Sequence, residues 1–142
     1  MGGGCAVSAP AGLVRRRAWL VWAAVMLVWA VIPISWLLGH ASSSQASLLT
    51  TTAHFCEYVV LAGLVVLAAR SYWPSRPWLA GAALGVLAGL LYGPLTEVVQ
   101  LPLPYRSFQV GDILADWSGT LVGALAFTAV CGWRARRRAL RA

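Results

Sequence analysis

The stretch WLAGAALGVLAGLLYGPLTEVVQ, residues 78–100, decides the class of fold. Its one charged side chain is Glu97, and the segment has the ~20 apolar residues that an α-helix needs to cross a bilayer. Small residues recur in it at every fourth position, at Gly81, Gly85, Gly89 and Gly93. Such spacing lets helix backbones approach closely. The stretch therefore predicts a membrane-spanning helix packed tightly against its neighbours.

Further apolar stretches of similar length accompany this segment, at residues 18–38, 53–69 and 110–133. Together they predict an all-α fold, a polytopic transmembrane helical bundle with four spans. One basic tail precedes the bundle in the sequence and another follows it. The expected organisation is a tail at 1–17, the bundle at 18–133 and a second tail at 134–142.

The first apolar stretch and the residues after it are the least regular part of this pattern. Pro33 is expected to kink the helix, and the Ser/Thr-rich residues 39–52 are expected to form a polar loop. The stretch also resembles a cleavable secretory signal. Because it is longer than the usual apolar core of such signals, a retained span is favoured.

Composition excludes several classes of protein. The chain has 142 residues, of which 60% are hydrophobic and 11% are charged, whereas soluble domains have roughly 25% charged residues. A disordered chain and an ordinary water-soluble enzyme are therefore excluded, and three widely spaced cysteines give no disulfide framework. The net charge of +7 raises the option of nucleic-acid binding. The arginines flank the apolar stretches, however, so we expect contacts with membrane lipids and none with nucleic acid.

The arginines also indicate an orientation. All except Arg106 lie in the N-terminal tail, in the turn at residues 70–77 or in the C-terminal tail. An even number of spans places these three segments on one side of the membrane. Because basic loops stay in the cytoplasm, we expect a multi-pass plasma-membrane protein with both termini cytoplasmic and Arg106 outside.

The four acids lie at the outer ends of the predicted spans. Glu57 opens the second span, Glu97 closes the third, and Asp112 and Asp116 open the fourth. Helical spacing groups the polar side chains into three faces, His54–Glu57–Tyr58, Glu97–Gln100 and Asp112–Asp116. Exposing ionisable groups at membrane depth costs roughly 2.5–3.5 kcal/mol each, so we expect these faces to point into the bundle.

These faces and the outer arginine supply the candidate ligand-binding residues: His54, Glu57, Tyr58, Glu97, Gln100, Arg106, Asp112 and Asp116. Three of them, His54, Glu97 and Asp112, are also catalytic candidates, because they could act as general base and general acid. Arg106 is expected to pair with Asp112 or Glu97 through its planar guanidinium. Because the carboxylates outnumber the cations, such a pocket can raise carboxyl pKa values, share protons or bind a cation, and we expect Glu97 or Glu57 to be protonated part of the time.

Purely structural roles remain open for most of these residues. Asp112 could cap the first turn of its helix, and His54 could bond a backbone carbonyl at the membrane interface. Glu57 could reach the lipid headgroups, and Arg106 could bind an outer-leaflet phosphate. Glu97 is harder to explain in this way, because it follows a Gly-Pro pair where the helix could partly unwind.

Two blocks carry a specific order of residues. His54-Phe55-Cys56-Glu57-Tyr58-Val59-Val60-Leu61 has the pattern HFxxYxxL, and the second block, with Glu97, Gln100, Arg106, Phe108 and Asp112, has the pattern ExxQ…R-x-F…D. This order resembles the VanZ-like family of bacterial membrane proteins. Asp116 stands where that family commonly has Asn, and residues 50–52 are threonines where it often has an acid and a lysine. The resemblance implies a link to teicoplanin-type glycopeptide resistance, with no agreed reaction.

Several functions fit such a site. The first is binding or remodelling of a cell-envelope amphiphile, such as a membrane lipid, a lipid-linked cell-wall precursor or a lipoglycopeptide. The alternatives are an intramembrane hydrolase or transferase acting on a lipid-linked substrate, a proton- or cation-coupled exporter, and an assembly partner whose glycine faces pair two chains into a homo-oligomer. We expect no cofactor and no metal, because a single histidine beside the acids is a sparse ligand set.

Overall fold

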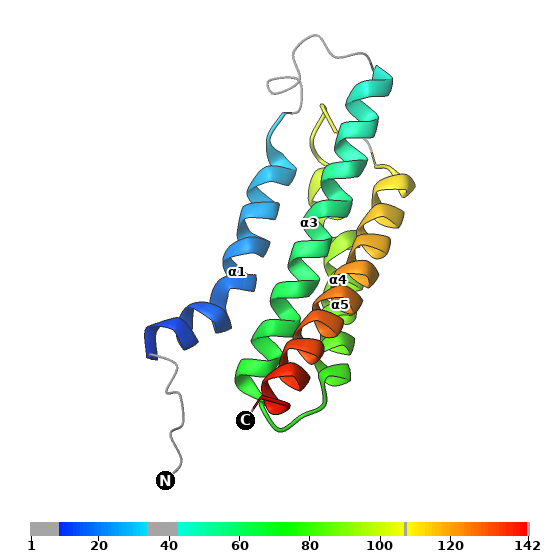
Figure 1. Cartoon of the computed structure of the whole chain (residues 1–142). Coiled ribbons are helices and arrows are strands. Elements are labelled where there is room, and N and C mark those ends of the chain that lie inside the picture. Colours follow the sequence, from blue (N-terminus) through cyan, green and yellow to red (C-terminus); the bar gives the residue numbers. More distant parts are fainter. Residues whose placement is uncertain (1–8, 34–42, 107, 142) are drawn as a thin grey trace.

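A computed structural model describes residues 9–33, 43–106 and 108–141 of the chain. Within these residues all the regular structure is α-helix: α1 (Ala9–Val31), α3 (Ser43–Tyr72), α4 (Trp78–Gln100) and α5 (Val110–Ala139). Consecutive helices run in opposite directions, and the start of α1 lies at the same end of the bundle as the end of α5 (Figure 1). The predicted all-α class is confirmed.

Three of these helices are long and apolar enough to cross a membrane, namely α3, α4 and α5. Helix α1 does not meet the same criterion, because Arg15, Arg16 and Arg17 lie within it and the apolar stretch after them ends at Val31. That stretch is shorter than the ~20 residues that a span requires. Residues 34–38, which the sequence assigned to the first span, lie outside the described residues. The number of four spans is therefore not established.

Two segments differ from the sequence-based expectation around the first connection. Helix α1 ends at Val31, so Pro33 follows the helix instead of kinking it. Residues 43–52, which were expected to belong to a polar loop, form the first turns of α3 instead. Within these turns the hydroxyls of Thr50 and Thr52 each donate to the carbonyl four residues earlier, at 2.7 Å, and so do not compete for the backbone from a non-helical conformation.

The other helices follow the predicted stretches more closely. Helix α4 covers the same residues as the third apolar stretch and continues through Pro94 without the partial unwinding considered there. Helix α5 starts at the expected residue, but it extends to Ala139 and so includes most of the basic C-terminal tail. Arginine is a good helix former, so the basic tail can continue the helix beyond its apolar part.

Helix α3 is central, because it packs against α1, α4 and α5 (Figure 1). Several side-chain hydrogen bonds tie helix α1 to the bundle, and two of them involve Trp22 and Tyr92. Trp22 Nε1 donates to the Glu57 carbonyl of α3 at 3.0 Å, and the Tyr92 hydroxyl of α4 donates to the Ala23 carbonyl at 2.5 Å. Beside these bonds Met26 of α1 is buried against Tyr58 of α3.

The glycine faces bring the helices into close contact inside one chain. A Cβ atom at Gly119 would lie 2.2 Å from the Phe55 carbonyl oxygen, so α5 meets the backbone of α3 there. A Cβ atom at Gly89 would lie 2.0 Å from the Thr120 hydroxyl, so α4 meets α5. The glycine faces that could have paired two chains are thus occupied within the bundle. This packing fixes the positions of α3, α4 and α5 along the bundle axis relative to one another.

Candidate functional site

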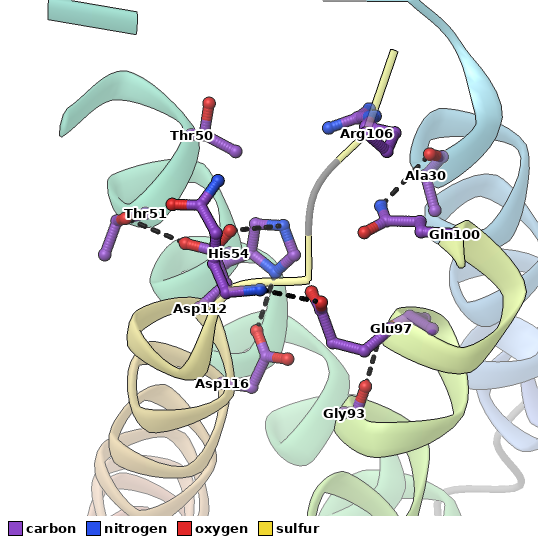
Figure 2. A network of polar contacts seen from close by, with 12 residues as sticks. Ala30, Thr50, Thr51, His54, Gly93, Glu97, Gln100, Arg106, Asp112 and Asp116 are labelled. Atoms are coloured by element: carbon purple, nitrogen blue, oxygen red, sulfur yellow. Dashed lines mark hydrogen bonds and ion pairs between the residues drawn. The ribbon is translucent and has the colours of Figure 1, made fainter. Parts of the chain in front are cut away.

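The polar side chains gather where α3 and α5 begin and α4 ends. Glu97 from α4 and Asp112 and Asp116 from α5 have exposed fractions of 1%, 4% and 0%. The ring of His54, from α3, lies between Asp112 and Asp116, and Glu97 points toward this group from the opposite side (Figure 2). Side chains from three helices thus form one cluster, the acid–histidine cluster, consisting of His54, Glu97, Asp112 and Asp116.

The shortest contact in the cluster joins His54 to Asp116. Their Nδ1 and Oδ1 atoms are 2.9 Å apart, and the Asp116 side chain is fully buried. When the Asp116 carboxyl is ionised it only accepts hydrogen bonds, and Nδ1 then carries the proton and donates it. In a neutral ring Nε2 then carries a lone pair, and this atom lies 4.0 Å from Asp112 Oδ2. Asp116 therefore both orients the imidazole and selects its tautomer.

The other two acids are each held by one oxygen. Asp112 Oδ1 accepts a hydrogen bond from the Thr51 hydroxyl at 2.8 Å. Glu97 Oε2 accepts one from the Gln109 backbone N–H at 3.3 Å, just before α5 begins. Glu97 Oε1 and Asp116 Oδ2 are buried with no hydrogen-bond partner among the described residues. Buried carboxylate oxygens without partners are uncommon, so the cluster retains unused acceptor capacity.

The structure contradicts the predicted pairing of Arg106 with Asp112 or Glu97. Among the described residues, no carboxylate lies within 4.0 Å of its guanidinium. Arg106 instead donates to the carbonyls of Trp29 at 3.3 Å and Ile32 at 2.9 Å. The physical reason is that the last carbonyls of a helix lack intrahelical partners, and α1 ends beside the connection that carries Arg106. Burial lowers the pKa of this guanidinium, yet its ordinary value is high enough to keep it charged at neutral pH.

A cavity of about 210 Å³ adjoins the cluster, between α1, α3, the end of α4 and the α4–α5 connection. Its apolar wall consists of Met26, Trp29, Ala30, Leu49 and Ala53. Its polar wall consists of Thr50, His54, Glu57, Tyr58, Thr96, Gln100 and Arg106. Five of the predicted ligand-binding residues therefore line one cavity.

The remaining three predicted residues lie elsewhere in the bundle. Glu97, Asp112 and Asp116 are not among the residues that line the cavity, and His54 belongs both to its wall and to the acid–histidine cluster. The site thus has two compartments that share one imidazole. One is an apolar cavity with a polar wall, and the other is a buried set of carboxylates.

Two polar residues of the cavity wall hold the helices together. Gln100 Nε2 donates to the Ala30 carbonyl of α1 at 3.0 Å. The hydroxyl of Tyr58 lies 3.2 Å from that of Thr96, and so links α3 to α4. Both contacts position the wall, so these residues have a structural role whether or not they touch a ligand.

Sequence reasoning did not identify Thr51 as part of the site. Thr51 lies three residues before His54 and therefore on the same face of α3, which is a usable signal. The signal was hidden because residues 39–52 were expected to form a loop, where helical spacing has no meaning. The Gln109 backbone N–H was not identifiable either, since its contact with Glu97 depends on how the connection turns.

The chain is similar to a known protein family over most of its length. The family model described as VanZ/LLP1 matches residues 15–131, which is most of the chain. The match includes every residue of the acid–histidine cluster and of the cavity wall. No curated protein and no solved structure matches the chain.

Proposed function

We propose a function for this chain, which belongs to the VanZ/LLP1 family, and we infer it from the Arg106 guanidinium in the wall of its cavity. The chain binds an anionic amphiphile of the cell envelope, with the headgroup at Arg106 and the hydrocarbon part against α1 and α3. The observation that carries this proposal is that Arg106 lines the cavity with no acidic partner among the described residues. Its Nε atom is buried and has no acceptor in that part of the chain.

The two walls of the cavity match the two parts of an amphiphile. Met26 and Trp29 of α1 and Leu49 of α3 give an apolar surface that suits a hydrocarbon chain. The N–H groups at Nε and Nη1 of Arg106, for which the described residues provide no acceptor, suit a phosphate or a carboxylate. Glu57, on the same polar wall, can accept from an ammonium or a sugar hydroxyl. A phospholipid headgroup and a lipid-linked cell-wall precursor both carry this chemistry.

The membrane arrangement belongs to the same proposal. Helix α1 serves as the fourth span, and the chain lies in the plasma membrane with both termini in the cytoplasm. The support is the distribution of arginine, which concentrates in the two tails and in the α3–α4 turn and leaves only Arg106 at the other end. The cavity then opens on the extracytoplasmic side.

Native mass spectrometry of protein extracted gently from bacterial membranes tests the binding proposal. The wild-type chain is expected to retain an anionic amphiphile, and Arg106→Gln to lose it. Arg134→Gln, which removes an exposed arginine at the opposite end of the bundle, is the matched control and keeps the amphiphile. If the wild type retains no amphiphile, or if Arg106→Gln retains as much as the control, the proposal is wrong.

A link to glycopeptide resistance follows from envelope binding. Cells that express the wild-type chain are expected to differ from Arg106→Gln cells in susceptibility to teicoplanin-type glycopeptides, at equal membrane abundance of the two proteins. Equal susceptibility would refute the link to glycopeptide resistance and would leave the binding result unaffected.

One observation favours an intramembrane hydrolase or transferase as a second candidate. His54 is oriented by the buried Asp116, the arrangement that a general base requires. The hydroxyl that α4 contributes to the cavity wall, that of Thr96, donates to the Gly93 carbonyl of its own helix. Turnover of a lipid-linked phosphate ester by the purified chain, lost in His54→Ala, would establish this candidate, whereas absence of turnover would remove it.

A further inference from the structure

We propose that His54, Glu97 and Asp112 form a binding site for a divalent transition-metal cation of the Zn²⁺ type. One ligand atom of each residue lies within 4.8 Å of one ligand atom of each of the others. Zinc bound by nitrogen and oxygen ligands at ~2.0–2.1 Å holds those atoms roughly 3.3 Å apart. Small side-chain rotations therefore suffice to close the three groups around an ion. This inference departs from the sequence-based expectation of no metal and does not depend on the amphiphile.

The imidazole is presented as a metal ligand. Asp116 accepts the Nδ1 proton of His54 at 2.9 Å, which leaves the lone pair on Nε2. Metal-binding histidines characteristically donate their second ring nitrogen to a carboxylate in this way, which fixes the ring and raises its basicity. Nε2 is also the atom that faces Asp112 Oδ2, at 4.0 Å. Asp116 is thus a positioning residue.

The two carboxylates are arranged similarly, with one oxygen anchored by the protein. Thr51 holds Oδ1 of Asp112, and the Gln109 N–H holds Oε2 of Glu97. The second oxygen of Glu97, Oε1, is buried and has no partner in the described residues, in a side chain that is only 1% exposed. An unsatisfied buried carboxylate oxygen is costly unless something absent from the chain itself binds it. A cation bound between the three side chains would satisfy it.

The charges of the cluster support the same conclusion. Three carboxylates approach one another inside the bundle, and His54 is the one basic side chain within 4.0 Å of any of them in the described ranges. A divalent ion bound to a neutral His54 would cancel the charges of Glu97 and Asp112. The remaining charge, on Asp116, would be stabilised by the Nδ1 proton and by the ion behind the ring.

The donor set narrows the class of cation. One imidazole nitrogen with two carboxylate oxygens suits Zn²⁺, should bind Mn²⁺ more weakly because Mn²⁺ lies at the bottom of the usual affinity order, and suits Mg²⁺ least because that ion prefers an all-oxygen shell. Three protein ligands also leave an open coordination position, which water can occupy. The ion would bind Nε2 of His54, the residue that the cluster shares with the cavity wall.

Direct metal binding to the purified chain in detergent, stripped of metal with a chelator, tests the proposal. Isothermal titration with Zn²⁺, Mn²⁺ and Mg²⁺ is expected to give one Zn²⁺ per chain, weaker Mn²⁺ binding and the weakest binding for Mg²⁺. Substitution with Co²⁺ should produce visible absorption bands that report nitrogen and oxygen ligation. If the wild-type chain binds no Zn²⁺, the proposal is overturned.

Variants identify the ligands. Asp116→Asn, which keeps the shape but weakens the orientation of His54, is expected to lower Zn²⁺ affinity roughly 10–100-fold. Glu97→Gln and Asp112→Asn remove ligands and should cost more than Asp116→Asn. Cys131→Ala, which removes a free thiol of α5 outside the three-residue group, should keep the wild-type affinity.

Thermal unfolding of each variant without metal provides the control for folding. If a variant unfolds early, its affinity is not interpreted, and the midpoint of thermal unfolding of the wild-type chain is measured with and without Zn²⁺ instead. This midpoint must rise with Zn²⁺ if the ion binds the folded chain. Zn²⁺ affinity that stays unchanged in both Glu97→Gln and Asp112→Asn would place the ion elsewhere and refute the assignment.

Discussion

The contact between α5 and α3 at Gly123 makes a strong prediction about packing. A Cβ atom at this position would lie 2.3 Å from the Val59 carbonyl oxygen and 2.8 Å from Val59 Cα. Both atoms belong to the backbone of α3, so no side-chain rotation can relieve the overlap. Ordinary contact begins at 3.4 Å, so Gly123→Ala must separate the two helices by about 1 Å.

The expected cost follows from two opposing effects. Overpacking of a well-packed interior costs about 1–3 kcal/mol. Replacing glycine with alanine inside a helix stabilises it by roughly 1 kcal/mol. Gly132→Ala is the matched control, because Gly132 also lies in α5 and a Cβ atom there meets nothing within 4 Å. The control should be neutral or slightly stabilised, and Gly123→Ala should be less stable than the control by about 1–3 kcal/mol.

The assay is the free energy of unfolding in detergent micelles, measured by titration with a denaturing detergent and followed by tryptophan fluorescence. Both variants gain the same helix propensity, so their difference isolates the contact with α3. Helix α5 carries Asp112 and Asp116, and its displacement should therefore also weaken Zn²⁺ binding. If Gly123→Ala were as stable as Gly132→Ala, the close approach of α5 to α3 would be refuted.

Two further predictions concern single hydrogen bonds. Thr51→Val removes the donor to Asp112 and should lower the free energy of unfolding by about 1–3 kcal/mol, whereas Thr52→Val, at an exposed position, should stay within about 0.5 kcal/mol of the wild type. Equal losses in the two variants would contradict the Thr51 contact. Tyr92→Phe removes the bond from α4 to the backbone of α1 and should speed amide hydrogen exchange in α1, while Tyr72→Phe should not. Unchanged exchange in Tyr92→Phe would mean that this bond does not hold α1.

Local patterns in the sequence were sufficient to predict much of the fold. The apolar stretch at residues 78–100 is bounded by Pro77 and Pro102, so its limits are set by backbone chemistry that a sequence displays. The inward direction of Asp112 and Asp116 also follows from local information, because their spacing places them on the face that continues into the packed glycines of α5.

The partner of Arg106 could not be predicted in this way. Its contacts depend on where α1 ends, and that end lies far away in the chain, beside the α4–α5 connection. Charge alone favoured an acid, but the unsatisfied carbonyls of α1 compete for the same donors. The separation of the cavity from the acid–histidine cluster was not foreseeable for a related reason. It depends on α1, which packs against α3 and α4 and supplies part of the cavity wall, whereas Asp112 and Asp116 lie on α5.

The central claim is that the polar cavity opens on the extracytoplasmic side of the membrane, and cysteine accessibility in intact cells tests it most directly. In a chain whose native cysteines are replaced, Thr50→Cys places a thiol on the cavity wall, and Ser75→Cys places one in the exposed turn between α3 and α4. A membrane-impermeant maleimide should label Thr50→Cys in intact cells, and should label Ser75→Cys only after the membrane is opened. Labelling of Ser75→Cys in intact cells, with Thr50→Cys protected, would contradict the account.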